Sequence, residues 1–216
     1  MQTVNGRQET LPTVNEYLAQ FVSVPEHHRY IWPAVKEFMP QGQAHCILDA
    51  GCGKGEIACR LAEDGNRVLA VDIFRDESML ANGLVRHVVR SVEQPLADLG
   101  PFDAVVSVEV IEHLYSPLKA LKNFYDALKP GGTLIVTTNY HGYAKNLALS
   151  ICNRWDRHFE ATIEGGQVKF FSRKTLSELL DRAGFERVEY RYVGRGPLIW
   201  NSIVACARKP RPSAST

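Results

Sequence analysis

The chain has 216 residues, 45% of them hydrophobic and 23% charged, and this composition is typical of a soluble globular protein. Its 25 basic and 24 acidic residues leave a net charge of +1, which argues against a protein whose main task is to bind a polyanion. The five cysteines contain no Cys-x-x-Cys pair, which argues against a disulfide framework. The sequence shows no signal-peptide pattern and no run of 18 apolar residues, which argues against secretion and a membrane span. Together these features predict a cytoplasmic protein.

Composition and hydrophobic spacing divide the chain into three regions. Residues 1–40 are predicted to form a helical cap, because aromatic and aliphatic side chains recur at helical spacing over most of this region. Pro25 and Pro33 are expected to break or kink that helix. Residues 41–208 contain regular strand and helix patterns without a long linker, so they are predicted to form one domain. Residues 209–216 have the composition of a disordered end.

Short apolar runs alternate with helical segments along the predicted domain. The runs are apolar throughout, which is typical of strands buried on both faces, and the segments between most of them leave room for crossover helices. The predicted strands are 46–49, 67–72, 85–90, 102–108, 133–138, 187–193 and 202–207, with helices after the first strand, over 118–128 and over 173–183. The eight residues between the last two strands allow an antiparallel pair but no crossover helix. We therefore predict an α/β fold, a doubly wound and mostly parallel seven-stranded sheet with an antiparallel C-terminal edge hairpin.

A glycine-rich loop, Gly51-Cys-Gly-Lys-Gly-Glu56, follows the first predicted strand. Glycines at this turn allow close approach to a ligand, which in a doubly wound sheet binds at the carboxyl ends of the strands. The third glycine of the dinucleotide fingerprint would fall at Glu56, and a carboxylate beside a diphosphate is electrostatically unfavourable. Asp49 suits a cationic group, and Asp72, 19 residues after Gly53, suits ribose hydroxyls. These features fit S-adenosylmethionine; the alternative is a tight turn in which Asp49 only caps a helix.

Four stretches, 48–56, 71–72, 102–107 and 128–134, together resemble the motifs of the class I S-adenosylmethionine-dependent methyltransferases, and the likeness extends over about residues 45–208. The resemblance implies a Rossmann-like methyltransferase domain over 41–208, with a lid insertion at 140–170. It implies that the methionine half of the cofactor contacts the glycine loop, the ribose contacts Asp72 and the adenine lies near Ser91 and Val92. The cofactor-binding residues implied in this way are Asp49, Gly51, Cys52, Gly53, Asp72, Ile73, Ser91, Val92 and Val108.

A cluster of acids and a histidine, Glu109, Glu112 and His113, follows the fourth predicted strand. On a helical turn these three positions share one face, so the side chains are expected to point together into the mouth of the cofactor crevice. Two carboxylates and an imidazole can bind a divalent cation: the carboxylates suit Mg²⁺ or Mn²⁺, and the histidine leaves Zn²⁺ or Fe²⁺ open. The alternatives are a role in proton transfer or positioning, and a purely structural role.

The Glu-x-x-Glu-His pattern is similar to that of the ubiquinone-biosynthesis O-methyltransferases and of the small-RNA 2′-O-methyltransferases. In both, the resemblance associates these positions with a divalent metal, and in the second group with a further downstream histidine. His158 in the insertion is the predicted counterpart of that histidine, and His141 is the alternative. The predicted metal ligands are therefore Glu109, Glu112, His113 and His158.

The methyl group of a sulfonium is already a strong electrophile, so an enzyme needs to align the nucleophile, exclude water and accept a proton. A cation bound by the cluster lowers the pKa of an acceptor hydroxyl. Without a cation, His113 is the favoured general base, with Glu112 as the second catalytic residue. Aromatic residues in the insertion, such as Tyr143 and Trp155, suggest a lid over a planar or apolar acceptor.

We therefore predict an S-adenosylmethionine-dependent methyltransferase that acts on a small-molecule hydroxyl of the quinone, polyketide or saccharide type. An RNA ribose 2′-O-methyltransferase is the alternative enzyme, but the net charge of +1 gives no support for a nucleic-acid partner. A non-catalytic scaffold that binds the cofactor is the alternative outside the enzymes. A nicotinamide oxidoreductase is disfavoured by Glu56.

Overall fold

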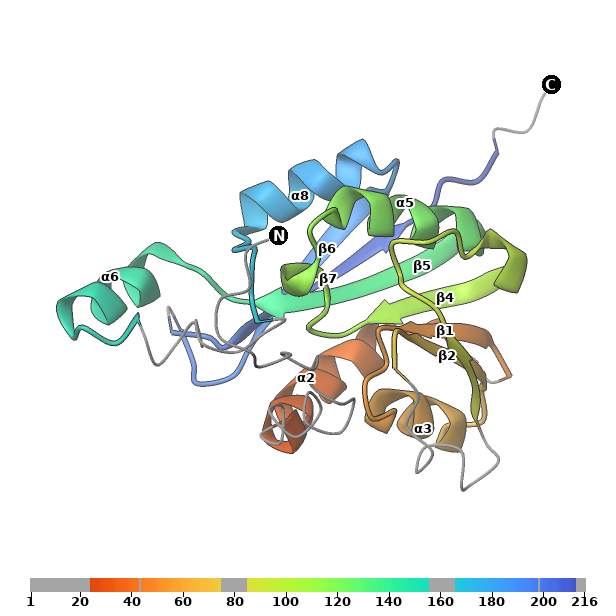
Figure 1. The fold of residues 1–216 in the computed structure, drawn as a ribbon, viewed down its shortest axis with the longest axis horizontal. Helices are drawn as coiled ribbons and strands as arrows, with labels where there is room; N and C mark the ends of the chain where they lie inside the picture. The colour runs from red at the N-terminus through yellow and green to blue at the C-terminus, as the bar shows by residue number, and fades with distance from the viewer. Residues whose placement is uncertain (1–23, 43, 75–84, 156–165, 198, 213–216) are drawn as a thin grey trace, which may run out of the picture.

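The computed structural model describes residues 24–42, 44–74, 85–155, 166–197 and 199–212 (Figure 1). A helix lies between β1 and β2 and another between β4 and β5, as the hydrophobic runs predict. In chain order the elements are α2 (Val24–Phe38), β1 (Cys46–Ala50), α3 (Glu56–Glu63), β2 (Arg67–Asp72), β3 (Val85–Val89), η1 (Ala97–Leu99), β4 (Phe102–Ser107), η2 (Ile111–His113), α5 (Pro117–Ala127), β5 (Leu128–Asn139), α6 (Tyr143–Ile151), α8 (Arg173–Arg182), β6 (Glu186–Val193) and β7 (Ser202–Arg208). No helix in these residues is long and apolar enough to cross a membrane.

The sheet has the predicted topology. Seven strands of the described chain form one sheet in the order β3-β2-β1-β4-β5-β7-β6. Its first five strands are parallel neighbours, whereas β7 is antiparallel to both β5 and β6. The strand order reverses between β1 and β4, and this reversal is the point at which doubly wound sheets bind ligands. The predicted doubly wound fold with an antiparallel edge is confirmed.

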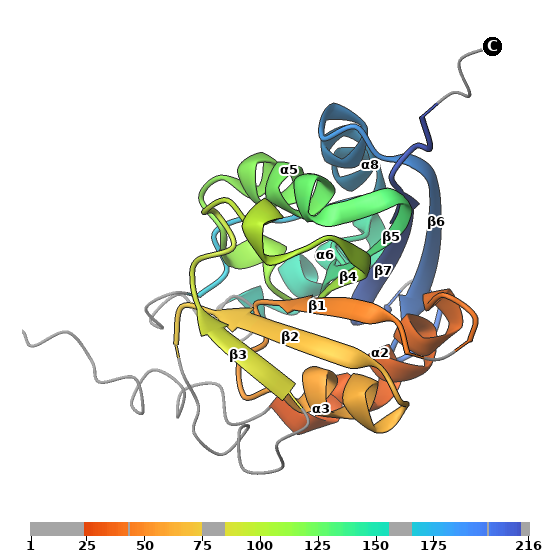
Figure 2. The same ribbon diagram turned by 90° about the vertical axis from the view of Figure 1, so that its right-hand side faces the viewer.

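Helices cover both faces of the sheet, with α5 and α8 on one face and α2 and α3 on the other (Figure 2). Adjacent residues of one strand therefore enter different cores. Val105 of β4 belongs to the same core as Phe124 of α5 and Leu176 of α8, while Val106 belongs to the core that contains Ile31 of α2 and Leu61 of α3. This double coverage is the physical reason that the strands are apolar at every position.

The N-terminal helix α2 is part of this layered core. Ile31 and Val35 are fully buried, and Arg191 of β6 donates hydrogen bonds to Glu37 of α2. The helix continues through Pro33, so this proline does not end it as the sequence suggested. Residues 1–23 of the predicted cap lie outside the described residues. The boundary at residue 40 stays a prediction.

The start of β5 differs from its predicted position. The strand begins at Leu128, and Gly131 and Gly132, which were expected only to stop the preceding helix, lie inside it. The pairing with β4 skips from Leu128 to Thr133 because a bulge interrupts the register. Gly131 adopts φ +78°, a conformation that favours glycine at such an irregularity.

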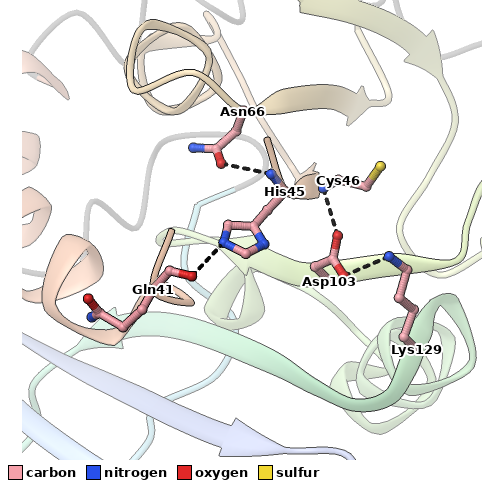
Figure 3. Close-up of polar contacts among 6 residues, drawn as sticks. All are labelled: Gln41, His45, Cys46, Asn66, Asp103 and Lys129. Atoms are coloured by element: carbon pink, nitrogen blue, oxygen red, sulfur yellow. Dashed lines mark hydrogen bonds and ion pairs between the residues drawn. The ribbon is translucent and has the colours of Figure 1, made fainter. Parts of the chain in front are cut away.

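Polar contacts fasten the amino ends of the central strands (Figure 3). The amide of Cys46 donates to Asp103 at 2.8 Å, and the Lys129 ammonium donates to the other carboxylate oxygen of Asp103 at 2.6 Å. Burial on its own would raise the pKa of Asp103, but these two hydrogen bonds outweigh it and the pKa is lowered. His45 donates its backbone amide to Asn66. The network joins β1, β4 and β5 at the edge opposite the carboxyl ends of the parallel strands.

Candidate functional site

The glycine loop joins β1 to α3 at the carboxyl edge of the sheet. Gly51, Gly53 and Gly55 all have positive φ, at +79°, +51° and +77°. A Cβ atom at Gly51 would lie 2.4 Å from Cγ2 of Val110, whereas one at Gly53 would meet nothing within 4 Å. The first glycine is therefore required by packing, and the second faces open space. A bound ligand can approach the backbone closely at Gly53.

Asp72, at the end of β2, holds the loop in place. Its Oδ2 accepts a hydrogen bond from the Gly53 amide at 2.8 Å, and its Oδ1 accepts one from the Phe74 amide at 3.2 Å. The carboxylate predicted to bind ribose thus already orders the turn on which the ligand would lie. Ile73, the next residue, exposes 54% of its surface beside this acid.

Asp49 is the most unusual acid of the site. It is only 1% exposed, and its Oδ2 has no hydrogen-bond partner in the described part of the chain. Burial raises the pKa of Asp49 to about 7, the charge of Asp72 adds to the rise, and the backbone amide of Ala58 opposes it. A buried carboxylate that lacks a partner is costly in a folded protein unless a ligand satisfies it. A cationic amino group is a suitable ligand for it.

The other predicted cofactor residues lie along the same edge and differ in what their side chains do. Val92 and Val108 are buried in the two cores, so only their backbones are free to face a ligand. The carbonyl of Val92 accepts a hydrogen bond from Asn123. The hydroxyl of Ser91 accepts one from the Glu93 amide. The Sγ atom of Cys52 points to the carbonyl of the next residue, at 3.8 Å.

Glu56 links the glycine loop to α2. Its Oε2 lies 2.7 Å from Nδ1 of His28, and its Oε1 accepts a hydrogen bond from Arg60 at 2.8 Å. Two basic side chains therefore contact this carboxylate, which the sequence could not show. The charge of Glu56 is therefore a weaker argument against a diphosphate ligand than the sequence suggested. The stronger argument is the carboxylate of Asp49.

The turn after β4 brings two carboxyl groups together. Glu109 has φ +52°, and only Ile111–His113 form a helix, of the 3₁₀ type, so the expected regular helical turn is not formed. Even so, the carboxyl groups of Glu109 and Glu112 lie close enough for each to affect the pKa of the other, and Oε2 of Glu112 has no hydrogen-bond partner in the described part of the chain. The hydroxyl of Thr137 donates to Glu109 at 2.9 Å, and the side-chain amide of Asn139 donates to Oε1 of Glu112 at 3.4 Å. The end of β5 thus supports both acids.

Burial governs the ionisation of this pair. Glu112 is 1% exposed, and burial raises its pKa to about 7 against the hydrogen bonds that it accepts. Burial also raises the pKa of Glu109 well above its usual value, and the charge of Glu112 raises it further. Two adjacent carboxyl groups in a buried site share protons, because both cannot ionise at low cost. One member of the pair is therefore suited to accept a proton near neutral pH.

The predicted metal ligands do not all converge. Within the residues that the structure describes, no group of three or more histidine, cysteine, aspartate or glutamate side chains is placed to hold a metal ion. Glu109 and Glu112 meet, but His113 does not complete a set of three with them. His158 lies outside the described residues, and the ring of His141 packs edge-on against Phe170 at 5.0 Å. The described residues therefore do not fit the predicted cation site.

Backbone hydrogen bonds attach the insertion at 140–170 to the turn that carries Glu109 and Glu112. The amides of Val168 and Lys169 both donate to the carbonyl of Glu112, at 2.9 and 3.0 Å. The helix of this insertion, α6, lies apart from the two helix layers (Figure 1), and Tyr143 at its start is 84% exposed. Tyr140 instead packs against two aromatic rings from the β6–β7 edge, Tyr192 and Trp200. Phe159, a further aromatic residue of the insertion, lies outside the described residues.

Sequence reasoning missed several polar residues whose charges or hydrogen bonds act on the carboxyl pair of Glu109 and Glu112 or on each other. Burial raises the pKa of Tyr30 on α2, while hydrogen bonds with Asn201 and Ser202 oppose the rise. Ser202 also hydrogen-bonds to Glu109. Burial lowers the pKa of Lys145 on α6 to about 8, and the charge of Glu109 opposes this shift. These residues come from three distant segments, and no local motif marks them.

Comparisons with known proteins agree with this fold and site. Residues 25–190 match the methyltransferase domain family. The chain is 37% identical over 181 residues to a ubiquinone biosynthesis O-methyltransferase of Xanthomonas campestris pv. campestris, covering 76% of each protein. It is 32% identical over 165 residues to a protein of the same name from Ruegeria pomeroyi, covering 71% of this chain and 65% of that protein. The chain thus spans about two thirds to three quarters of these relatives.

The fold also matches a crystal structure of the Burkholderia thailandensis 1,6-didemethyltoxoflavin-N1-methyltransferase with bound 1,6-didemethyltoxoflavin and S-adenosylhomocysteine. The TM-score is 0.63, the identity 22%, and the match covers 93% of this chain and 92% of that one. The fold and the cofactor edge thus define a Rossmann-like methyltransferase. The chain belongs to the family of S-adenosylmethionine-dependent methyltransferases.

Proposed function

We propose that the chain methylates a hydroxyl group of a small molecule, with S-adenosylmethionine as the methyl donor. The observation that carries the cofactor assignment is the buried carboxylate of Asp49, whose Oδ2 lacks a partner in the described part of the chain, beside an open Gly53. A cationic amino group would satisfy Asp49, and ribose hydroxyls would reach Asp72. Ile73, Ser91 and the backbone of Val92 would complete the contacts along this edge. When bound, this cofactor supplies a methyl group on a positively charged sulfur.

The carboxyl pair supports the choice of a hydroxyl acceptor. A hydroxyl that attacks a methyl group must lose its proton, and the proton needs a base whose pKa lies near the working pH. Burial gives Glu112 a pKa of about 7, which meets that requirement. We assign Glu112 as the proton acceptor, Glu109 as the acid that interacts with it and His113 as a neighbouring catalytic group. Two relatives named O-methyltransferases support the same chemistry.

Assays of the Glu112→Gln variant test this assignment. Glutamine keeps the shape of the side chain but cannot accept the proton, so we expect methyl transfer to fall by about 10²-fold or more. We expect S-adenosylhomocysteine affinity to change less than about threefold, because the cofactor groups are untouched. The matched control is Glu63→Gln on the exposed end of α3, which should keep full activity. Full activity in Glu112→Gln contradicts the role of Glu112.

A divalent cation remains a separate proposal, because the described residues do not complete a ligand set and no step of the reaction is derived through a metal. Mg²⁺ would need both acids of the pair, with His113 and His158 as further ligands. The same assay with and without EDTA tests this proposal: loss of activity that Mg²⁺ restores supports the cation. Full activity in EDTA shows that the carboxyl pair acts without one.

A further inference from the structure

Three side-chain contacts join α2 to α3, which cover the same face of the sheet (Figure 2). Each contact joins a residue of α2 to the residue 28 positions later in the chain. In order along the helices they are His28 with Glu56 at 2.7 Å, Trp32 with the guanidinium of Arg60 at 5.7 Å from the ring centroid, and Lys36 with Asp64 at 2.9 Å. Because both sets of residues are four apart, α2 and α3 run side by side in the same direction.

The first of these contacts lies at the glycine loop. Glu56 is the first residue of α3, whereas Asp64 follows its last turn. Gly55, the N-cap residue, has φ +77° and provides no side-chain hydrogen bond to the helix. The first turn of α3 therefore lacks the side-chain cap that usually fixes the start of a helix. The side chain of Glu56 is instead held from outside the helix.

His28 is the residue that holds Glu56 from α2. A carboxylate only accepts hydrogen bonds, so this contact requires the hydrogen of the His28 ring on Nδ1. The other carboxylate oxygen, Oε1, accepts a hydrogen bond from Arg60 of the same helix. The side chain of His28 is 13% exposed, whereas that of Lys36 in the third contact is 58% exposed. The contact at the loop is thus the better shielded from water.

The loop is therefore held at two nearby points by two different elements. Asp72 of β2 accepts a hydrogen bond from the Gly53 amide at 2.8 Å, and His28 of α2 holds Glu56, three residues later. The backbone between these two points includes the open position at Gly53. Loss of either anchor would let this backbone move relative to the buried carboxylate of Asp49.

We propose that His28 is a positioning residue for the cofactor. Through Glu56 it holds the backbone of Gly53 to Gly55 in the conformation that receives the methionine half of S-adenosylmethionine. This inference rests on the proposed function, because it extends the cofactor site to a helix outside the glycine motif. His28 does not touch the cofactor in this account; it lowers the cost of ordering the loop when the cofactor binds.

Calorimetric titration of S-adenosylhomocysteine into the full chain tests this role. His28→Ala should weaken binding about tenfold, because the loop loses one of its two anchors. His28→Asn should recover most of the affinity, since its side-chain amide offers an N–H near the position of Nδ1. Lys36→Met is the matched control: it breaks a contact between the same two helices away from the loop, and its affinity should stay within about twofold of wild type.

A double-mutant cycle shows whether His28 acts through Glu56. Glu56→Ala alone should weaken binding to about the same extent as His28→Ala, and the double variant should bind no more weakly than Glu56→Ala. A double variant in which the two losses multiply contradicts the proposed route. Thermal melts establish that each variant is folded at the temperature of the titration, so that a loss of affinity is not a loss of fold.

The outcomes separate this role from the proposed function. Wild-type affinity in His28→Ala, equal losses in His28→Ala and Lys36→Met, or a folded His28→Asn that binds as weakly as His28→Ala overturns the positioning role alone. Binding of S-adenosylhomocysteine without methyl transfer to any hydroxyl compound overturns the proposed acceptor and leaves the differences between the variants intact. No binding of S-adenosylhomocysteine by wild type overturns both.

Discussion

At the scale of single residues, the site depends on acids that are buried, where their charged forms are unfavourable. Asp49 lies in the core beside a second acid, Asp72, and a folded protein keeps such a group only if it serves a purpose or finds a partner. A ligand cation supplies that partner. The same reasoning explains why Glu112 is buried beside Glu109. Both acids lower the stability of the fold, and both are available for ligand binding or proton transfer.

Asp49→Asn tests this trade through its dependence on pH. Because the pKa of Asp49 is raised from 3.8 to about 7 on folding, the ligand-free folded state holds a proton that the unfolded state has lost between these values. Stability of the wild-type protein therefore falls as pH rises through this window. We expect the variant to match wild type near pH 4 and to be more stable at pH 8, by on the order of 2 kcal/mol. Thermal melts across pH measure this difference.

The same variant should bind the cofactor poorly. Asparagine has no charge to offer an amino group, so the affinity for S-adenosylhomocysteine should fall more than about tenfold at pH 8. Wild-type affinity should rise as pH increases toward 7, while that of Asp49→Asn stays flat. A variant that is less stable at pH 8 and binds as well as wild type would show that Asp49 is an ordinary core residue.

Gly51 and Gly53 form a matched pair within the loop. Gly51→Ala adds a Cβ atom 2.4 Å from Cγ2 of Val110 at a positive φ, so the free energy of unfolding should fall by about 2 kcal/mol or more. Gly53→Ala meets open space and should cost only about 1 kcal/mol of backbone strain, but it should weaken cofactor binding more than tenfold. Chemical denaturation and calorimetry separate the two effects. Equal losses of stability would contradict the geometry of the loop.

At the scale of elements, the strands and most helices could be predicted from the sequence because their signals are local. β2 has the predicted bounds, and α8 begins at its predicted first residue, where Ser172 and Thr175 form a capping box. The turn at 109–113 could not be predicted, since its positive φ at Glu109 depends on the hydrogen bond from its amide to Thr137 of β5. Local spacing carries no information about such a contact.

The N-terminal helix gives a test of element packing. Because Ile31 of α2 is fully buried against the sheet, Ile31→Ala should lower the free energy of unfolding by about 2–4 kcal/mol. Lys36→Ala on the same helix removes an exposed ion pair with Asp64 and a cation–π contact with Trp32, and it should change the free energy of unfolding by less than about 1 kcal/mol. Urea denaturation measures both variants. A small effect of Ile31→Ala would mean that α2 is a detachable cap rather than part of the core.

At the scale of the whole molecule, the two edges of the sheet have different roles. The amino edge is closed by an ion pair and hydrogen bonds around Asp103 (Figure 3). The carboxyl edge carries the open glycine, the partnerless Oδ2 of Asp49 and the carboxyl pair. The cofactor side of that edge could be predicted because most of its residues belong to one short sequence motif. The residues near the carboxyl pair could not, because Tyr30 of α2 and Ser202 of β7 are far apart in the sequence and meet only in the folded protein.

The central claim is that the edge beside Asp49 and Asp72 is built for a sulfonium nucleoside rather than a dinucleotide. Calorimetry with S-adenosylhomocysteine and NADH, each titrated into the purified chain at pH 8, tests it most directly. We predict saturable one-to-one binding of S-adenosylhomocysteine, which Asp72→Ala abolishes, and no binding of NADH. Tight binding of NADH with no response to S-adenosylhomocysteine would contradict the account.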